Sequence, residues 1–294
     1  MSDVLAISGL KKRYGDFELD IPELRVETGT VMGLVGANGA GKSTTLKLIL
    51  NLIQRDGGTI QVMGMDNQRE DTAIKQDIGV VFDEPCFHDL LTPAQIGKSM
   101  RSWYAKWDDE LYQRYLHKFE LPPSKRVKEF SRGMKMKLAI AAAMCHRPRL
   151  LLLDEPTGGL DPLVRDEILD MFLEFLQEED HSIILSSHIT SDLDKIADTI
   201  ALIDHGKVRF HEEKDVLRDG YALIKGSADQ LRTLDRRELV GVRENRFGFE
   251  ALCRRDMASR HPELASERPD IEQIMLFFTR RHPDGEEKSA KGAV

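Results

Sequence analysis

The sequence has few of the features that would place it in a membrane, outside the cell or on nucleic acid. Its three cysteines, Cys86, Cys145 and Cys253, show no C-x-x-C spacing, which argues against a disulfide framework and a zinc site. No apolar run approaches the roughly 20 residues that a membrane-spanning helix needs. Residues 1–3 do not begin a basic segment followed by an apolar one, which is the pattern of a secretion signal. Basic residues number 42 against 50 acidic ones, and the net charge of −8 has the wrong sign for holding nucleic acid through an overall field. We therefore expect a protein of the reducing cytosol.

What is present is the composition of a folded globular protein. Hydrophobic residues make up 41% of the chain and charged residues 31%, which excludes a low-complexity sequence. At roughly 100 to 200 residues per domain, a chain of 294 residues forms one large domain or two ordinary ones. It is long enough to bury the core of an enzyme.

Strand-like and helix-like segments alternate through much of the chain. Short apolar stretches bounded by turn residues predict strands. They cover residues 4–7, 19–35, 59–62, 78–82, 150–153 and 182–187. Helical spacing of apolar residues follows Gly41 and recurs through Ile168, Phe172 and Phe175. The last two strand-like runs are typical of buried parallel strands, and this alternation predicts an α/β fold.

Two regions depart from the alternation. Residues 93–147 have a helical pattern with a break at Pro122-Pro123, which predicts a helical subdomain over about residues 86–147. Beyond residue 217, shorter segments predict a small α/β domain over residues 218–281. Its expected strands cover residues 221–225, 239–242 and 247–253, and its expected helices cover residues 227–234 and 270–281. The polar residues 282–294 predict a disordered tail.

A phosphate-binding loop is the strongest motif. Residues 36–43 read G-A-N-G-A-G-K-S and fit G-x-x-x-x-G-K-[ST], between a predicted strand and a helical run. Backbone N–H groups of such a loop bind phosphates, Lys42 supplies a cation, and Ser43 offers a hydroxyl to Mg²⁺. A glycine-rich turn that precedes a lysine by chance is the alternative. The predicted nucleotide-binding residues are Gly36, Asn38, Gly39, Ala40, Gly41, Lys42, Ser43 and Thr44.

A second motif places two carboxylates at the end of a buried strand. Asp154 and Glu155 follow four leucines, and open α/β sheets bind ligands at the carboxyl ends of their strands. In this Walker B interpretation, Asp154 is a partner of Mg²⁺ and its water shell, and Glu155 polarises the attacking water. The alternative, an acidic cap on the turn before Pro156, would suit either carboxylate alone.

With three further motifs in the same order, the chain resembles the nucleotide-binding subunit of an ATP-binding cassette (ABC) transporter over roughly residues 3–217. Residues 130–134, F-S-R-G-M, resemble the family's signature, residues 158–161 its D-loop, and His188 its switch histidine. The resemblance implies a P-loop NTPase ABC ATPase core over residues 1–217 with a helical subdomain insertion, followed by the small C-terminal domain. It also implies ATP and Mg²⁺ as ligands.

The resemblance implies roles for these residues. In the family, the signature serine and glycine, here Ser131 and Gly133, complete the ATP site of the opposite subunit. A simple helix N-cap is the alternative for Ser131. The switch histidine contacts the γ-phosphate, so Lys42, Glu155 and His188 are the implied catalytic residues. A structural histidine at a strand end is the alternative for His188.

Two positions carry weaker signals. Tyr14 resembles the aromatic residue that stacks on adenine, and a half-buried strand tyrosine is the alternative. Asp83 stands where the family usually has glutamine, and its carboxylate could approach Mg²⁺ directly or through water. The predicted metal-binding residues are therefore Ser43, Asp83 and Asp154. An acidic residue here, as in some ABC proteins similar to bacteriocin and lantibiotic exporters, favours export.

The implied function is that of an ATP-hydrolysing transporter subunit. Such a subunit dimerises with a second copy or a related ATPase around two MgATP molecules and drives a separate membrane-spanning permease. We expect it in the cytoplasm, at the inner face of the membrane through that permease, with no direct nucleic acid partner. Candidate docking residues are Phe87, Leu90, Trp103 and Trp107, although the two tryptophans could instead form the subdomain's own core.

Two other functions are weighed against transport. An ABC ATPase that acts on nucleic acid or the ribosome usually carries two cassettes or long coiled-coil insertions, whereas this chain has one phosphate loop and a net charge of −8. An inactive ATP sensor would be expected to lack Lys42 or Glu155, and both are present.

The last predicted helix has an apolar stripe. Ile271, Ile274, Met275 and Phe278 fall at i, i+3, i+4 and i+7. Packing on its own domain is one interpretation. In the other, Phe277 widens the apolar face enough to meet the same domain of a second subunit.

Overall fold

The computed structural model describes residues 2–84 and 87–279, and it forms two compact units, Met1–His211 and Glu212–Val294. The domain boundary expected near residue 217 falls inside helix α8 (Lys214–Gly220). The expected end of the last helix at residues 280–281 and the expected disordered tail at residues 282–294 lie outside the described residues. Every helix in the described ranges is too short or too polar to cross a membrane.

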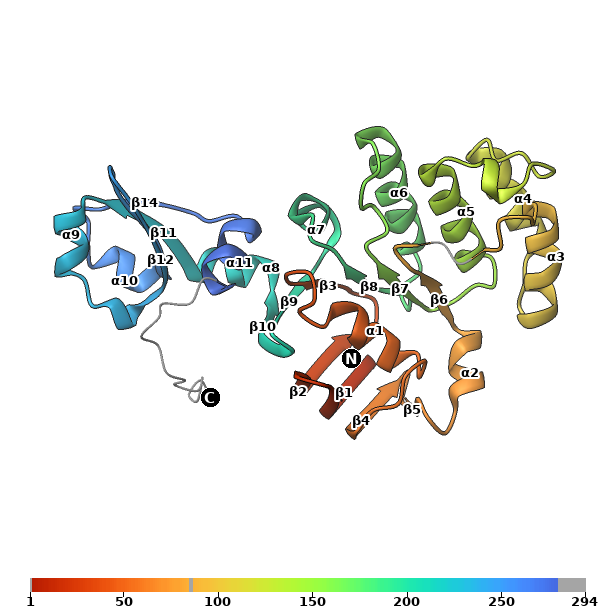
Figure 1. The fold of residues 1–294 in the computed structure, drawn as a ribbon, viewed down its shortest axis with the longest axis horizontal. Helices are drawn as coiled ribbons and strands as arrows, with labels where there is room; N and C mark the ends of the chain where they lie inside the picture. The colour runs from red at the N-terminus through yellow and green to blue at the C-terminus, as the bar shows by residue number, and fades with distance from the viewer. Residues whose placement is uncertain (1, 85–86, 280–294) are drawn as a thin grey trace. The chain divides into compact units, whose positions relative to one another are not determined.

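The first unit is built on a mixed sheet with the strand order β5-β4-β1-β2-β10-β9-β3-β8-β7-β6 (Figure 1). The strands are β1 (Asp3–Tyr14), β2 (Phe17–Glu27), β3 (Val31–Val35), β4 (Gly57–Val62), β5 (Met65–Asp66), β6 (Ile78–Val81), β7 (Leu150–Asp154), β8 (Ser182–Ser186), β9 (Thr199–Asp204) and β10 (Lys207–Glu213). β1 pairs antiparallel with β2 and β4, whereas parallel pairings join β6, β7, β8, β3 and β9. The predicted α/β class is confirmed.

The central strands position the functional site. β3, β7 and β8 are buried along their whole length, as expected where both faces of a parallel sheet are covered. Asp154 of β7 pairs with Ser186 of β8, and Val81 of β6 pairs with Leu153 of β7. Because these strands run parallel in this register, the segments that follow them begin at the same edge of the sheet.

Helices cover this sheet and extend beyond one of its edges. They are α1 (Lys42–Ile49), α2 (Asp71–Gln76), α3 (Pro93–Trp103), α4 (Asp109–Lys118), α5 (Arg132–Met144), α6 (Pro162–Phe175) and α7 (Thr190–Ile196). Figure 1 shows α3, α4 and α5 gathered beside the edge strand β6, where the sequence predicts a helical subdomain. Tyr112 of α4 is buried, and its hydroxyl donates to the Pro93 carbonyl oxygen at the start of α3 (3.0 Å).

The two tryptophans of this helical region differ in environment. The Trp107 ring lies 5.1 Å from the Tyr112 ring, and its Nε1–H donates to Asp109 (3.0 Å). Trp103, at the end of α3, is 73% exposed, and Leu90 is also exposed. Trp107 is thus half-buried against Tyr112 of its own subdomain, whereas Trp103 and Leu90 are exposed and remain candidates for docking.

The second unit is an antiparallel sheet, β12-β13-β11-β14, with its own buried core. After α8, its elements are β11 (Tyr221–Gly226), α9 (Ala228–Thr233), β12 (Leu239–Asn245), β13 (Gly248–Arg254), α10 (Arg255–Ser259), β14 (Ala265–Glu267) and α11 (Ile271–Thr279). The strands and helices expected in this part of the chain are present, whereas α8, α10 and β14 are not predicted by the sequence.

Helix α11 packs on its own unit. Ile271, Ile274 and Phe277 are buried. A Cβ added at Gly241 of β12 would lie 3.2 Å from Phe277 Cδ1, so the Phe277 ring rests on this strand. The expectation that Phe277 meets a second subunit is therefore wrong, and the alternative of local packing is correct.

Candidate nucleotide site

Two glycines let the phosphate loop lie directly on the sheet between β3 and α1. A Cβ on Gly36 (φ 154°) would lie 2.2 Å from the carbonyl oxygen of Ile203, and one on Gly41 (φ 118°) would lie 2.8 Å from Leu19 Cδ1. Any other residue would push the loop away from its neighbours. Helix α1 begins at Lys42, directly after this turn, and its first N–H groups have no acceptor within the helix. The loop and helix together form an anion-binding terminus.

The loop borders a pocket of about 390 Å³ at the carboxyl ends of the central strands. Besides loop residues, the lining includes the ring of Phe17 and the carboxylates of Asp83, Asp154 and Glu155. Lys42 also lines the pocket and is 6% exposed. The structure thus brings the phosphate loop and the predicted acidic residues into one cavity.

Glu155 makes the central contacts of the pocket. One carboxylate oxygen, Oε1, lies 3.6 Å from Lys42 Nζ, which itself donates to the Gly36 carbonyl oxygen (2.8 Å). The other, Oε2, accepts from the backbone N–H of His188 (3.2 Å) and lies 2.6 Å from its ring Nδ1. Since a carboxylate only accepts, Nδ1 carries the proton of this bond. Glu155 has a left-handed backbone with φ of 51°, a strain that residues at functional sites often carry.

Asp154, Asp83 and Ser43 contribute oxygen atoms to the pocket lining. Asp154 is 6% exposed, and its Oδ1 accepts from the Ser186 hydroxyl (2.7 Å). Within residues 2–84 and 87–279, no group of three or more His, Cys, Asp or Glu side chains could hold a metal ion alone. Ser43, Asp83 and Asp154 nevertheless line the same pocket as the phosphate loop. Mg²⁺ is commonly held by one or two such oxygens together with phosphates and water, so these residues fit the ion.

Asp83 has a partner that the sequence does not predict. Its Oδ1 accepts from Nη2 of Arg132 at 2.8 Å, and both side chains are about half exposed. Arg132 is the first residue of α5 and belongs to the signature-like segment. The residue that departs from the family pattern is therefore bonded to that segment within the same chain.

Six predicted residues lie outside the pocket lining, namely Tyr14, Gly36, Ala40, Ser131, Gly133 and His188. Ser131 caps α5, since its hydroxyl oxygen accepts from the Met134 N–H (3.2 Å), and Gly133 lies in the first turn of that helix. Tyr14, at the end of β1, is 45% exposed, and its ring centroid lies 5.1 Å from Lys12 Nζ. The N-cap alternative for Ser131 is thus present in the structure.

Two residues of the site are not predicted from the sequence. Phe17 lines the pocket, and its ring would lie 3.3 Å from a Cβ at Gly41. Ser186 supports Asp154 from the adjacent strand. The available signal for Ser186 was a small polar residue near the carboxyl end of a buried strand, and for Phe17 an aromatic residue just after the Gly15 turn.

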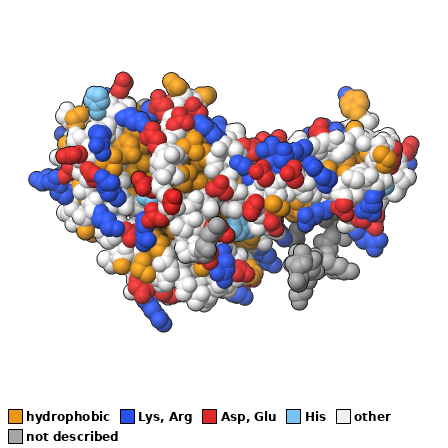
Figure 2. Space-filling model, turned by 180° about the vertical axis from the view of Figure 1, so that it is seen from behind, with side chains coloured by type: hydrophobic (Ala, Val, Ile, Leu, Met, Phe, Trp, Pro, Cys, Tyr) orange, Lys and Arg blue, Asp and Glu red, His pale blue; other side chains and the backbone are white. Residues whose placement is uncertain are grey.

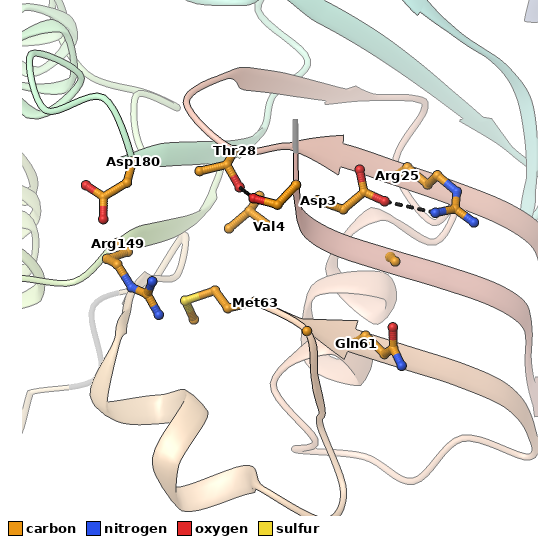
Figure 3. A pocket seen from close by; sticks show the side chains of 11 residues that line it. Asp3, Val4, Arg25, Thr28, Gln61, Met63, Arg149 and Asp180 are labelled. Carbon is orange, nitrogen blue, oxygen red and sulfur yellow. Dashed lines mark hydrogen bonds and ion pairs between the residues drawn. The ribbon is translucent and has the colours of Figure 1, made fainter.

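A second cavity, drawn in Figure 3, lies near the residues that precede β3, β7 and β8, at the end of these strands opposite the first pocket. It has about 470 Å³ and is lined in part by Arg25, by Asp180 and by Arg149, which precedes β7. Figure 3 shows Arg25 bonded to Asp3 (2.9 Å), so this guanidinium already has an acidic partner. The lining of this cavity includes neither the glycine-rich loop nor Asp154 and Glu155 at the end of β7.

The surface shows no broad basic field on the face drawn in Figure 2. Lys and Arg side chains alternate there with Asp and Glu side chains. A protein that binds the phosphate backbone of nucleic acid presents a clustered basic patch instead. This face gives no support to the nucleic acid alternative.

Comparison with known proteins points to one family. The family described as ABC transporter matches residues 19–158. The chain is 32% identical over 206 residues to the ABC transporter ATP-binding protein YtrB of Bacillus subtilis (strain 168), covering 70% of each protein. It is 34% identical over 215 residues to the lantibiotic transport ATP-binding protein SrtF of Streptococcus pyogenes, covering 72% of this chain and 92% of SrtF. A solved ATP binding subunit of an ABC transporter matches with a TM-score of 0.67 and 28% identity, over 73% of this chain and 92% of that one.

Proposed function

Because this chain belongs to the ATP-binding subunits of ABC transporters and is an ATPase, we propose that it dimerises around two MgATP molecules and drives a separate membrane-spanning subunit. The observation that carries the proposal is the position of Glu155, in contact with both Lys42 and His188 inside the phosphate-loop pocket. The Lys42 cation can bind phosphate, the Glu155 carboxylate can orient water, and the His188 imidazole is bonded to that carboxylate.

The phosphate loop and Lys42 bind the triphosphate in this proposal. The N–H groups at the start of α1 are directed to an anion, and the Lys42 ammonium exchanges its bond to the Gly36 carbonyl oxygen for a phosphate oxygen. The exposed ring of Tyr14 stacks on adenine, and Phe17 adds apolar contact in the same pocket.

Ser43, Asp83 and Asp154 hold the magnesium ion. When bound, Mg²⁺ neutralises negative charge on the phosphates. The Ser186 hydroxyl fixes the rotamer of Asp154 by its bond to Oδ1, so this carboxylate is oriented before the nucleotide binds.

Glu155 and His188 act on the attacking water. The Glu155 carboxylate is held by the backbone N–H and the ring of His188, which orients it as a general base. With Nδ1 bonded to Glu155, the opposite edge of the half-exposed His188 ring is left to contact the γ-phosphate. The Lys42 ammonium, 3.6 Å from Glu155 Oε1, places a positive charge between this carboxylate and the anionic nucleotide.

Ser131 and Gly133 act on the ATP of the partner subunit. Ser131 is the N-cap of α5, Gly133 lies in its first turn, and neither lines the pocket of its own chain. The start of a helix capped by Ser131 offers backbone N–H groups to a phosphate that another subunit brings. In a dimer, each chain would thus supply a phosphate loop to one ATP and a signature segment to the other.

We assign transport, in the direction of export, as the work that ATP hydrolysis drives. SrtF is by name a lantibiotic transport protein, and the acidic residue at position 83 points the same way. The partner is a permease that docks on the exposed Trp103 and Leu90, and it holds this chain at the cytoplasmic face of the membrane. We propose no direct nucleic acid partner.

The Glu155→Gln variant tests the proposal. Glutamine keeps the shape but cannot accept a proton, so we expect ATP turnover to fall at least about 100-fold while MgATP binding persists. The variant should also accumulate as an ATP-bound dimer, measured by light scattering. Glu178→Gln makes the same chemical change at an exposed side chain and should match wild type. Turnover near wild type in Glu155→Gln would assign the role of general base to another residue.

A further inference from the structure

Arg132 links the signature-like segment to the rim of the nucleotide pocket. Its Nη2 donates to Asp83 Oδ1 at 2.8 Å, across 49 positions of sequence. Asp83 follows β6 and lines the pocket, whereas Arg132 begins α5. The ion pair therefore joins two segments that are separate in the chain and that meet at the rim of the phosphate-loop pocket.

A pair of glycines confines the guanidinium on its other side. A Cβ added at Gly159 would lie 3.1 Å from Nη1 of Arg132, and one at Gly158 would lie 3.9 Å from Nη2. Gly159 also has a left-handed φ of 67°, which disfavours a side chain there. The arginine head group thus lies between the Asp83 carboxylate and the turn that follows Glu155, and it fits there because Gly159 lacks a side chain, whereas a Cβ at Gly158 would make only van der Waals contact with it.

The charges around the pocket give this contact a consequence for binding. Among the described residues, the pocket lining carries three carboxylates, those of Asp83, Asp154 and Glu155, and one ammonium, that of Lys42. A triphosphate that enters without a metal ion meets net repulsion from such a lining. The Arg132 guanidinium is a cation, and at 2.8 Å it offsets the charge of Asp83.

We propose that Arg132 is a positioning residue of the nucleotide site, which holds the Asp83 carboxylate toward α5 and offsets its repulsion of the triphosphate. This inference rests on the proposed function, since it assumes that phosphates bind in this pocket. Because Ser131 and Gly133 flank Arg132, the same ion pair ties the signature-like segment to the pocket of its own chain. Asp83 then meets the metal ion with its orientation already set by the arginine.

Binding of a fluorescent ATP analogue to the full chain in EDTA tests the inference, because no metal ion can then compensate for Asp83. Arg132→Met removes the charge and keeps the length, and we expect affinity to fall about two- to fivefold, the range of an exposed ion pair. Arg132→Lys should restore most of it. In the double variant Arg132→Met with Asp83→Asn, affinity should return to the wild-type range, since no carboxylate is left to repel the phosphates.

The matched control is Lys135→Met. Lys135 lies one turn further along α5 and pairs with Asp89, which does not line the pocket, so its loss should leave affinity unchanged. Wild-type affinity in Arg132→Met would overturn the inference. A double variant as weak as Arg132→Met would also overturn it, because the arginine would then attract phosphate directly. The proposed function fails separately, if wild type binds no ATP or if Lys42→Ala binds it equally well.

Discussion

His146 is a buried titratable residue that supports the helical region without taking part in the nucleotide site. It is 1% exposed, and its ring stacks on Tyr104 with centroids 3.9 Å apart. Its Nε2 lies 2.9 Å from the Ile78 carbonyl oxygen, and because a carbonyl only accepts, Nε2 carries the proton. Burial lowers the pKa of His146 from 6.5 to about 4. The folded protein therefore holds this ring neutral.

The lowered pKa of His146 predicts that the folded protein becomes less stable at acidic pH. Between pH 6.5 and pH 4 the unfolded chain takes up a proton that the folded chain refuses, so the free energy of unfolding falls as pH falls. At pH 4.5 this linkage amounts to about 2 to 3 kcal/mol. His146→Phe keeps a ring that cannot titrate, and urea unfolding at pH 7.5 and pH 4.5 should show a smaller difference than wild type by about that amount.

The same substitution at the exposed His117 is the control for this pH dependence. His117→Phe should lose as much stability between the two pH values as wild type does. An equally steep loss in His146→Phe would show that other groups cause the loss of stability at acidic pH.

Site residues were predictable where their chemistry is local in the sequence. The phosphate loop and the Asp154-Glu155 pair could be recognised because each occupies consecutive positions directly after a buried strand. The ion pair of Asp83 with Arg132 could not, because 49 positions separate the two residues and the contact depends on where α5 begins relative to β6.

At the scale of elements, a buried carboxylate connects the segments that follow β7 and β8. Asp192 of α7 is fully buried, and its Oδ2 accepts from the Thr157 hydroxyl (2.6 Å) in the turn after β7. Its Oδ1 accepts from Nε of Arg165 in α6. One side chain thus satisfies groups from two neighbouring segments, including the turn that carries Glu155.

Asp192→Asn should loosen this junction. Asparagine keeps the shape of the aspartate side chain but loses the negative charge that pairs with Arg165. Its NH₂ group would also face a hydrogen-bond donor, either the Thr157 hydroxyl or the Arg165 Nε–H. We expect the free energy of unfolding to drop by about 2 to 3 kcal/mol, measured by urea denaturation at pH 7.5. Asp170→Asn breaks an exposed contact between the same two helices, to Lys195 (3.0 Å), and should cost less than about 1 kcal/mol. Equal losses in the two variants would refute a special role for the buried pair.

Element length decides which parts of the fold the sequence could predict. β3, β7 and β8 are continuous apolar runs, which is the pattern of strands covered on both faces. α10 has five residues, and β14 has three, all exposed, so neither is long enough to show a period. Such short elements are set by the packing of the longer ones.

At the scale of the whole molecule, the two units have separate hydrophobic cores. The first core includes Leu34, Leu46 and Leu152 around the central sheet, and the second includes Ile224 and Phe249 in the antiparallel sheet. Burial of apolar surface dominates stability, so each core sustains its own unit. ATP binding couples to the stability of the first unit, because the phosphate loop and all residues of the pocket belong to it.

Two thermal transitions should therefore appear in calorimetry of the full chain, and ATP should move one of them. With the Glu155→Gln variant, which keeps the nucleotide intact, MgATP at 100 times its dissociation constant stabilises the first unit by about 2.7 kcal/mol. For a unit of this size that raises its transition by about 5 to 10 °C. Both tryptophans of the chain, Trp103 and Trp107, lie in the first unit, so their fluorescence identifies its transition. Combining Lys42→Ala with this variant should abolish the shift, whereas a single transition that moves as a whole would show that the two units unfold together.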